Sequence, residues 1–520
     1  MSSLSSATAA PPPLTGSARV LGTLALSAAT FMNVLDTSIA NVSLPAIAGD
    51  LGVSPVQGTW VITSFAVANA ISVPLTGWLT QRIGQVRLFM ASVLLFVLSS
   101  WLCGLAPNMS MLIAARALQG LVAGPLIPLS QTLLLSSYPR AMAGLAMAMW
   151  SITTLVAPIL GPLLGGWITD NISWPWIFYI NVPVGLLAAA AIWVIYRERE
   201  TAIKKVPIDT VGLSLLVLWV GALQLMLDRG KELDWFHSGE IIAFAVVAVV
   251  GLAFFLAWEL TEEHPVVDLS LFKRRNFWSS ALATAVGYGV FFGNVVILPL
   301  WLQQFMGYTA TQAGMVLAPV GLFAIILSPI VGLTLNRVDP RKYASFSFLV
   351  FALVLWMRSR FNTQTDFDTI MIPTLIQGVA MAFFFIPLVT LTLSGIESAR
   401  IPAASGLSNF MRITAGAIGT SISTTLWENR AAQHHATLAE SVHQGNQAAT
   451  ATLDTLQARG MSHDQALGYV NNLTTQQAYM LSTQEIFFVS AVLFLLLIPL
   501  VWLARRPKGA GNADAAVGAH

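Results

Sequence analysis

The fold is indicated by a stretch that occurs twice in the sequence. It reads LQGLVAGPLIPLSQTLL at 118–134 and, with one extra residue, IQGVAMAFFFIPLVTLTL at 376–393. The segment that follows repeats more weakly, as GLAMAMWSITTLVAPILG from Gly144 and GLSNFMRITAGAIGTSIS from Gly406. These stretches are apolar and as long as membrane-spanning helices, so they predict two related halves of a helical membrane protein. Two such halves are typical of transporters that rock about a central site.

The composition agrees with a chain that lies mostly in a bilayer. Of its 520 residues, 56% are hydrophobic and only 10% are charged, against about 25% charged residues in an average soluble domain. The alternation of an outer-membrane barrel strand is absent, so the spans are expected to be helices. The sequence therefore predicts an all-α integral membrane protein with fourteen transmembrane helices. They are expected at 20–44, 57–79, 87–106, 110–134, 143–168, 176–196, 209–227, 240–259, 277–303, 311–335, 342–358, 370–394, 405–427 and 484–503.

Lysine and arginine are concentrated in alternate loops, which predicts that both termini are cytoplasmic. The repeated spans are the fourth and fifth of one half and the twelfth and thirteenth overall, so two spans are surplus to two halves of six. The expected parts are a cytoplasmic leader at 1–19, an N-terminal six-helix bundle at 20–196, two inserted helices at 209–259, a C-terminal six-helix bundle at 277–503 and a cytoplasmic tail at 504–520. Within the second bundle, residues 428–483 are expected to form a helical segment outside the membrane, on the side away from the termini.

Asp36 is the one acidic residue predicted to lie deep within a span. An ionisable residue at that depth is costly and is therefore a functional candidate. At 1.5 Å per residue, Asp36 and Arg116 lie roughly 12 and 9 Å from the outer ends of their spans, so they can face each other. Burial disfavours the charged carboxylate and a nearby guanidinium favours it, so a change that separates the two groups would move a proton. The alternative is a permanent ion pair that only locks two helices together.

Arg412 is the second arginine expected inside the membrane, whereas Arg358 is expected at an outer loop. No deep acid is left to pair with Arg412, so its side chain is expected to snorkel toward the cytoplasmic face or to bond to backbone carbonyls.

The single cysteine, Cys103, is expected to be buried, and the seven histidines fall in loops or tails, so no metal site is expected. There is no Walker sequence or nucleophile elbow, which opposes ATP-driven transport and hydrolase chemistry. A net charge of +2 gives no reason to expect a nucleic-acid partner.

A central cavity is expected between the two halves. Aromatic and amide groups of several spans would together line an apolar, adaptable pocket, although packing or lipid contact is an equal alternative for each one alone. These residues are Phe65, Asn69, Gln119, Trp150, Tyr288, Phe291, Phe292, Asn294, Phe384, Phe385 and Arg412. The fifth span contains APILGPLLGGW at 157–167, whose prolines remove backbone donors and whose glycines allow a neighbouring helix to approach closely. This segment suits either tight packing or a moving hinge.

These motifs resemble those of the major facilitator superfamily, in its fourteen-span drug:proton antiporter branch. LDTSIANVSLP at 35–45 is similar to the first-span signature of that branch, with Asp36 at the acidic position. WPWIFYINVPVG at 174–185 resembles the entry to its sixth span. The phrases QGTWVITSFAVANAISVPLTGW, LDRGKELDWF and VDLSLFKRRNF extend the resemblance along nearly the whole chain. The fourth-span pattern RxxQGxxAG is matched by Arg116, Gln119, Gly120, Ala123 and Gly124, and the fifth-span antiporter pattern by Pro158, Gly161, Pro162, Gly165 and Gly166.

One loop departs from the family pattern. The loop between spans two and three usually reads GxLxDRxGRR, and here GWLTQRIGQVR at 77–87 has Gln81 at the acidic position. Gly77, Arg82 and Gly84 keep the pattern. A charge contact that latches the outward-open form is therefore not expected at Gln81.

The resemblance implies a multidrug efflux antiporter that exports lipophilic drugs and toxicants against an inward flow of protons and confers antibiotic resistance. It implies no cofactor beyond the proton gradient, and a multi-pass location among the lipids of a Gram-negative inner membrane. It also implies a tripartite pump with a periplasmic adaptor of the EmrA type and an outer-membrane channel of the TolC type, with 428–483 as the candidate contact. A proton symporter for uptake on the same scaffold is the alternative, and the fifth-span pattern opposes it. An enzyme would need convergent acids, histidines or a metal cluster, which the sequence does not offer.

Overall fold

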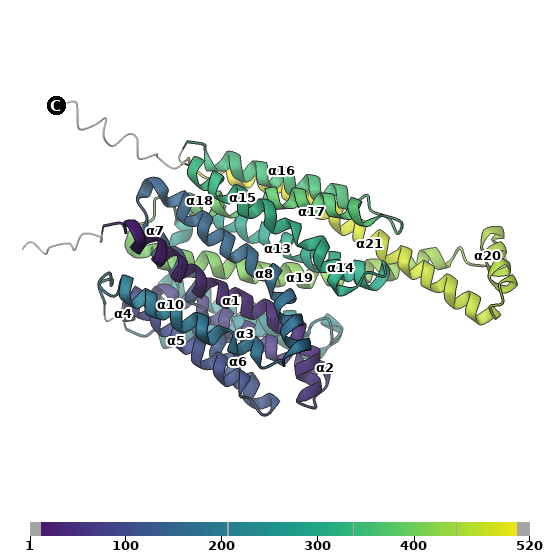
Figure 1. Ribbon diagram of the computed structural model, residues 1–520, viewed down its shortest axis with the longest axis horizontal. Helices are drawn as coiled ribbons and strands as arrows, with labels where there is room; N and C mark the ends of the chain where they lie inside the picture. Colours follow the sequence, from purple (N-terminus) through teal and green to yellow (C-terminus); the bar gives the residue numbers. More distant parts are fainter. Residues whose placement is uncertain (1–11, 205–206, 336, 444, 507–520) are drawn as a thin grey trace, which may run out of the picture.

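The computed structural model describes residues 12–204, 207–335, 337–443 and 445–506, and the regular elements within those ranges are all helices. Each stretch expected to span the membrane coincides with one helix or with consecutive helices (Figure 1). By length and composition, 11 helices of the described part are long and apolar enough to cross a membrane. The other three expected spans fall on helices that are more polar or only partly described. Fourteen spans are therefore compatible with the helices, and the count stays a prediction.

The first half is a bundle of helices that begins close to the N-terminus. Its helices pack around α1, which contacts α8 and α10 along its length, while α5 packs against α6 and α10, and α3 against α6. The bounds are α1 (Gly16–Asp50), α2 (Pro55–Gly58), α3 (Trp60–Ser72) with η1 (Val73–Leu75) and α4 (Thr76–Ile83), α5 (Gln85–Gly104), α6 (Met109–Ala123), α7 (Leu126–Ser137), η2 (Arg140–Met142), α8 (Ala143–Asn171), α9 (Trp176–Tyr179) and α10 (Asn181–Tyr196).

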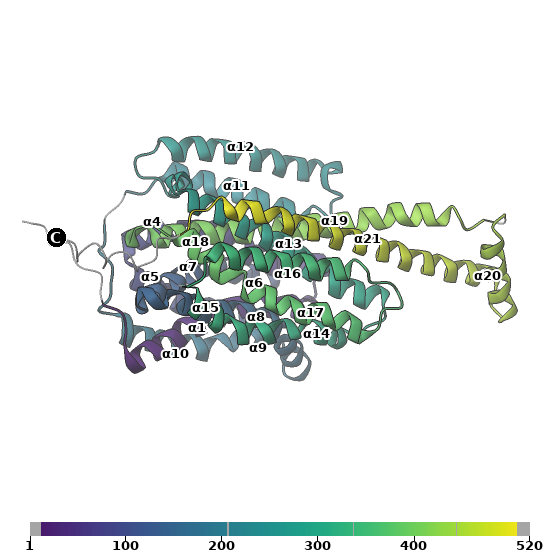
Figure 2. The same ribbon diagram turned by 90° about the horizontal axis from the view of Figure 1, so that it is seen from above.

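The second half repeats this arrangement, with α13 packed on α19 and α21 as α1 is packed on α8 and α10. Between the halves, α11 and α12 pair with each other at the side of the molecule, next to α3 (Figure 2). The bounds are α11 (Thr210–Arg229), η3 (Trp235–His237), α12 (Gly239–Thr261), η4 (Leu269–Lys273), α13 (Arg275–Phe305), α14 (Ala310–Leu317), α15 (Pro319–Thr334), α16 (Pro340–Arg358), α17 (Phe367–Ala382), α18 (Phe385–Leu393), η5 (Ser398–Arg400), α19 (Ile401–Ala439), α20 (Gln447–Ala458) and α21 (His463–Trp502).

The repeated stretch breaks at the same place in both halves. In the first half, Gly124 and Pro125 separate α6 from α7, and in the second Phe383 and Phe384 separate α17 from α18. A proline then stands in the first turn of each following helix, where a backbone donor is not needed. The sequence repeat therefore describes a broken helix that occurs once in each half.

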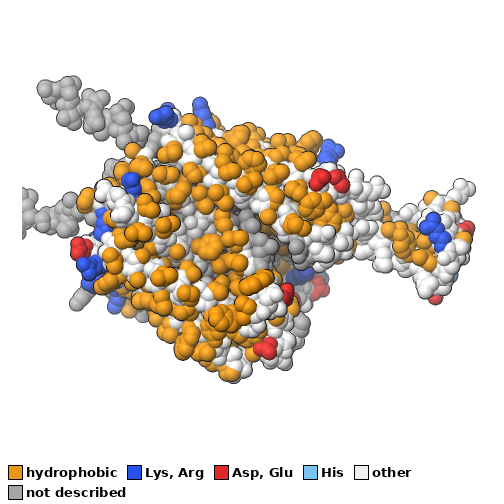
Figure 3. All heavy atoms as spheres, viewed as in Figure 1, with side chains coloured by type: hydrophobic (Ala, Val, Ile, Leu, Met, Phe, Trp, Pro, Cys, Tyr) orange, Lys and Arg blue, Asp and Glu red, His pale blue; other side chains and the backbone are white. Residues whose placement is uncertain are grey.

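The molecule has two different ends. Helix α1 begins and helix α21 ends at one end, which we call the base, and at the other end α19 and α21 extend beyond the bundles with α20 across their tip (Figures 1 and 2). We call this extension, residues 428–483, the arm. Hydrophobic side chains cover the flank between the two ends, and charged side chains gather toward the ends (Figure 3). A flank of that kind is what lipid contact requires.

Candidate functional site

Asp36 and Arg116 form an ion pair inside the first bundle. Their helices, α1 and α6, bring Arg116 Nη1 to 2.5 Å from Asp36 Oδ2, and the side chains of Arg116 and Asp36 are 1% and 0% exposed. The sequence had predicted that these two residues lie at the same depth in the membrane, and the structure brings them into contact. Among the described residues, four further charged side chains are buried: Asp209, Glu259, Arg358 and Arg412. None of those four is in an ion pair with another charged side chain of the described part.

The Asp36 carboxylate accepts hydrogen bonds from side chains of two other helices, α6 and α10. Its Oδ1 accepts from Gln119 Nε2 at 3.0 Å and from Asn181 Nδ2 at 2.9 Å. Ser100 on α5 accepts from both of these amides, at 2.7 and 3.1 Å, and so orients them. A carboxylate with these partners can be held charged in a buried place, because every donor is aimed at it.

Arg116 keeps other partners if the carboxylate leaves. Its Nε donates to the carbonyl oxygen of Val61 at 3.0 Å and its Nη1 also donates to Gln119 Oε1 at 2.6 Å. The ring of Phe65 lies 4.4 Å from the guanidinium carbon, as a cation–π partner. Gln119 therefore bonds to both charged groups.

The fifth-span motif packs α8 against the part of α1 that carries Asp36. Ser38 Oγ donates to the carbonyl oxygen of Pro158 at 3.1 Å. A Cβ on Gly161 would lie 2.5 Å from Ser38 Cβ, and one on Gly165 would lie 2.8 Å from Ile39 Cγ1. Close approach therefore requires glycine at both positions, whereas a Cβ on Gly166 would be in ordinary contact with Val42 at 3.9 Å. The side chain of Pro162 lies outside the described part of the structure.

The first glycine of the weaker repeat marks a contact between the two halves at the base. A Cβ on Gly332 of α15 would lie 2.5 Å from the carbonyl oxygen of Gly144 of α8, so the two backbones touch there. Nearby, a Cβ on Gly77 would lie 2.5 Å from that of Ala403. A Cβ on Gly406, the equivalent glycine of the second half, would lie 3.0 Å from the carbonyl oxygen of Val73. The halves are therefore closed against each other at the base.

A cavity of only about 10 Å³ lies between the halves, further from the base. That volume holds at most about one water molecule, so a drug-sized ligand needs the halves to separate. Its lining is made by Gln131, Trp150, Thr284, Phe385, Val389, Thr392, Ser408, Asn409 and Arg412.

Arg412 lines this cavity, for which it was a candidate, but the expectation that its side chain snorkels or bonds to backbone carbonyls was wrong. Its side chain is buried, its Nη2 donates to Asn409 Oδ1 at 2.8 Å, and it bonds to no backbone carbonyl among the described residues. The rings of Tyr288, Phe385 and Trp150 lie 4.7, 5.6 and 5.9 Å from its guanidinium carbon. Aromatic faces replace the missing acid as partners of the charge. Asn409 Nδ2 continues the contact across the halves to Gln131 Oε1 of α7 at 2.9 Å.

Of the residues expected at the cavity, Trp150, Phe385 and Arg412 line it and Tyr288 contacts Arg412, whereas the others lie elsewhere. Phe65 and Gln119 surround the ion pair, and Asn69 is close to Gly120, whose missing Cβ lets α6 approach α3. Phe384 packs in the core of the second half, and Asn294 Nδ2 donates to Ser490 Oγ at 2.9 Å. Phe291 contacts the ring of Phe351 edge to face, and Phe292 lies against the ring of Tyr288, both in the same half. Sequence reasoning missed Gln131, Thr284, Thr392, Ser408 and Asn409, which are polar positions in apolar spans.

The loop between α4 and α5 obtains its acid from another part of the chain. Glu200, which follows α10, accepts from the backbone amides of Val86 at 3.0 Å and Arg87 at 2.8 Å, and so caps the start of α5. The close approach requires Gly84, which has a φ of 96° and whose Cβ would lie 2.5 Å from Glu200 Cδ. Arg82 lies over the ring of Trp78 at 5.5 Å. An acid therefore meets this loop although Gln81 stands at the family's acidic position.

Comparisons with known proteins agree with this geometry. The model of the Major Facilitator Superfamily matches residues 26–420. The chain is 52% identical over 509 residues to the multidrug export protein EmrB of Escherichia coli, which covers 98% of this chain and 99% of that protein. It is 51% identical over 501 residues to the fatty acid resistance protein FarB of Neisseria gonorrhoeae, which covers 96% of this chain and 99% of that protein.

The fold also resembles a solved structure. The crystal structure of the human organic anion transporter MFSD10 (TETRAN) matches with a TM-score of 0.57 and 13% identity, over 94% of this chain and 100% of that one. At that identity the likeness supports the fold alone. The chain therefore belongs to the major facilitator superfamily, as a multidrug efflux transporter of the EmrB type.

Proposed function

We propose that the chain is a drug:proton antiporter in which Asp36 carries the proton. The observation that supports this is the buried pair of Asp36 with Arg116, which belongs to a hydrogen-bond network that joins five helices of one half. When a proton binds Asp36, the charge on the carboxylate is lost, and Arg116 keeps Gln119 and the carbonyl oxygen of Val61 as partners. Opening of the pair then changes how α1 is held in its bundle.

Helix α8 offers a path from this site to the base. It contacts α1 beside Asp36 through Gly161 and Gly165, and it contacts the other half through Gly144. These contacts are about 25 Å apart on one helix at 1.5 Å per residue. A shift of α1 against α8 therefore changes the fit of Gly144 on Gly332, which closes the base. Protonation at one site and opening at the other are coupled in this way.

We place the base on the cytoplasmic side of a Gram-negative inner membrane, because lysine and arginine favour the loops at that end. The cavity beyond it then receives substrate from the cytoplasm or the inner leaflet when the base opens. One relative is named for multidrug export and another for fatty acid resistance, and lipophilic compounds of both kinds suit a cavity with aromatic walls. Arg412 gives that cavity a positive charge, which favours substrates with an acidic group.

The direction of transport can be tested with purified protein in liposomes. We expect inside-acid vesicles to accumulate a lipophilic fluorophore that has no ionisable group, because protons leave as the compound enters. Accumulation is measured by fluorescence, with protein-free vesicles and a proton ionophore as controls. A neutral probe is needed, since a weak base would enter acidic vesicles without a transporter.

An antiporter and a symporter would move the probe in opposite directions in this assay. A symporter would expel the probe from inside-acid vesicles and accumulate it in inside-alkaline ones. Equal distribution with and without a pH gradient would contradict proton coupling of either kind.

We further propose that the arm binds a periplasmic adaptor of the EmrA type. The arm extends beyond both bundles, and Tyr469 and Leu473, which lie one turn apart on the same face of α21, are 46% and 41% exposed. Exposed apolar side chains along one helix are typical of helix–helix docking. An outer-membrane channel of the TolC type would then complete the pump through the adaptor.

Thiol cross-linking tests this contact, because the single cysteine, Cys103, is buried. We expect Tyr469→Cys to be cross-linked to a co-expressed EmrA-type adaptor. The control is Ile172→Cys, which is 52% exposed and lies outside the arm. Equal cross-linking of both variants, or of neither while the adaptor is still needed for drug resistance, would place the contact elsewhere.

A further inference from the structure

A third buried arginine lies in the second half, in a place that the sequence had assigned to an outer loop. Arg358 is the last residue of α16 and is 1% exposed. Its Nη2 donates to Thr374 Oγ1 at 3.0 Å and to Gln377 Oε1 at 2.6 Å, both on α17. Its Nε is buried and has no hydrogen-bond partner among the described residues. The guanidinium is therefore surrounded by neutral groups and still has a donor to offer.

The same donor set occurs in the first half, where it holds a carboxylate. Gln377 occupies the position of Gln119 in the sequence repeat. Each of these glutamines accepts a 2.6 Å hydrogen bond at Oε1 from an arginine, Arg116 in one half and Arg358 in the other. In the first half the arginine and glutamine together bind the carboxylate of Asp36. In the described part of the second half, no aspartate or glutamate is within ion-pair distance of Arg358.

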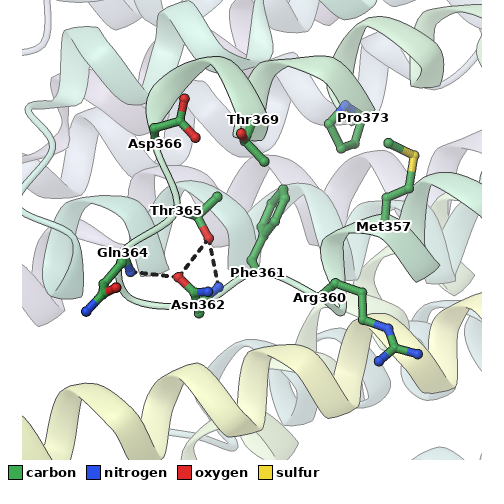
Figure 4. Close-up of a pocket in the computed structure, with 9 residues that line it drawn as sticks. All are labelled: Met357, Arg360, Phe361, Asn362, Gln364, Thr365, Asp366, Thr369 and Pro373. Carbon is green, nitrogen blue, oxygen red and sulfur yellow. Dashed lines mark hydrogen bonds between the residues drawn. The ribbon is translucent and has the colours of Figure 1, made fainter.

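A cavity of about 390 Å³ opens beside this arginine at the arm end of the molecule. Met357 and Phe361, on either side of Arg358 along the chain, line it, as does Pro373, which precedes Thr374 (Figure 4). Figure 4 shows Met357 and Pro373 together on one side, with Phe361 between them and the loop that contains Asn362 and Thr365. The cavity also has one cation and one anion in its lining, Arg360 and Asp366, whose charges offset each other. Arg358 and Thr374 are not part of the lining themselves, but the residues that precede them along the chain, Met357 and Pro373, are.

A buried guanidinium without a charged partner is costly, and an anion removes that cost. We propose that Arg358, Gln377 and Thr374 form a binding site for one small monovalent anion, a carboxylate or a halide, that enters through this cavity. The fork of the guanidinium fits a carboxylate, and Nε is the donor left for it. The site does not rest on proton-driven export, because it needs only the folded second half.

The test is thermal unfolding of the purified full-length protein in detergent at constant ionic strength. Chloride is compared with isethionate, a larger sulfonate, and octanoate is compared with octanamide, its uncharged analogue. We expect the unfolding midpoint to rise with the bound anion, by about 1–3 °C for each tenfold increase above its dissociation constant. Arg358→Gln should lose this rise, and Arg459→Gln, which removes an exposed arginine of the arm, should keep it.

The probes separate the two sources of the anion. A rise with chloride that requires Arg358 indicates an inorganic anion, and a rise with octanoate, but not with octanamide or chloride, indicates the carboxylate of an organic ligand. The proposal is overturned if no anion stabilises the wild type, or if Arg358→Gln responds as the wild type does. If Arg358→Gln does not accumulate, Gln377→Leu can be used instead, because it keeps the charge of Arg358 and removes the amide. We expect this variant to need more anion for the same rise in the unfolding midpoint. An unchanged dependence of the midpoint on the anion would also overturn the proposal.

Discussion

Asp36→Asn is expected to reduce proton-driven export to the level of cells that lack the transporter. Asparagine has the size of aspartate but no exchangeable charge, so the ion pair with Arg116 cannot open and close with a proton. The measurement is efflux of a lipophilic fluorescent compound from cells without their own exporters, with the proton gradient imposed or collapsed. The amount of protein in the membrane is measured in parallel, because an unpaired Arg116 costs about 3–5 kcal/mol of stability when a buried pair is broken.

Two further variants make this result decisive. Asp50→Asn removes a carboxylate from the end of the same helix, where it accepts from Trp174 Nε1 at 2.8 Å, and it should export normally. The double variant Asp36→Asn with Arg116→Gln removes both charges, so it should accumulate well and still not couple export to protons. Normal export by Asp36→Asn would mean that the pair is structural and that another group carries the proton.

Gly144→Ala is the second change with a large expected effect. A Cβ at this position would lie far inside contact distance of the carbonyl oxygen of Gly332, which is backbone and cannot rotate away. The halves then cannot close at the base, and export should fall to background. Gly332→Ala should act in the same way, because its Cβ would lie 2.5 Å from the carbonyl oxygen of Gly144.

Whether the two halves close at the base can be measured independently of export. Ser408 lines the central cavity, so Ser408→Cys reports access to it from the base. We expect a membrane-impermeant thiol reagent applied from the cytoplasmic side to label Ser408→Cys faster when Gly144→Ala is also present. Gly221→Ala is the matched control, since nothing lies within 4 Å of its Cβ. Slow labelling and normal export in the Gly144→Ala background would exclude this glycine contact as the seal.

Much of the fold could be predicted from the sequence because bilayer thickness fixes the length of an apolar helix. The all-helical architecture and the family were predicted correctly, and each expected span falls on a helix. The repeat at 118–134 and 376–393 also predicted two related halves, and the structure adds that this stretch is a broken helix in each half. The depth of Asp36 and Arg116 followed from the rise per residue, which is the same in every α-helix.

The cavity could not be predicted in the same way. Lipid-facing and core-facing positions of these helices are both apolar, so their periodicity does not show which face is inside. Phe291 and Phe384 were therefore predicted to line the cavity together with Phe385. Only the packing of the helices shows that Phe385 lines it and that the other two do not. Asn181 was visible as a polar residue at the start of a span, but nothing in its neighbours indicated that it would bond to Asp36.

The burial of charged residues near helix ends could not be predicted from the sequence either. Arg358 ends α16 and was expected outside the membrane core, yet α17 packs over it and buries it. Glu200 replaces the acid that the loop at Gln81 lacks, although the two are far apart in sequence. Burial of these residues depends on which helices become neighbours.

The sequence by itself determined that the chain is a helical membrane transporter with two related halves and a buried acid and base at one level. Hydrophobic length and helical rise are local properties, so they can be read residue by residue. The tertiary structure alone decided that Gly144 meets Gly332, that Arg412 is surrounded by aromatic rings, and that Arg358 is buried beside Gln377. Those contacts join helices from distant parts of the chain, and their partners are chosen by how the helices pack.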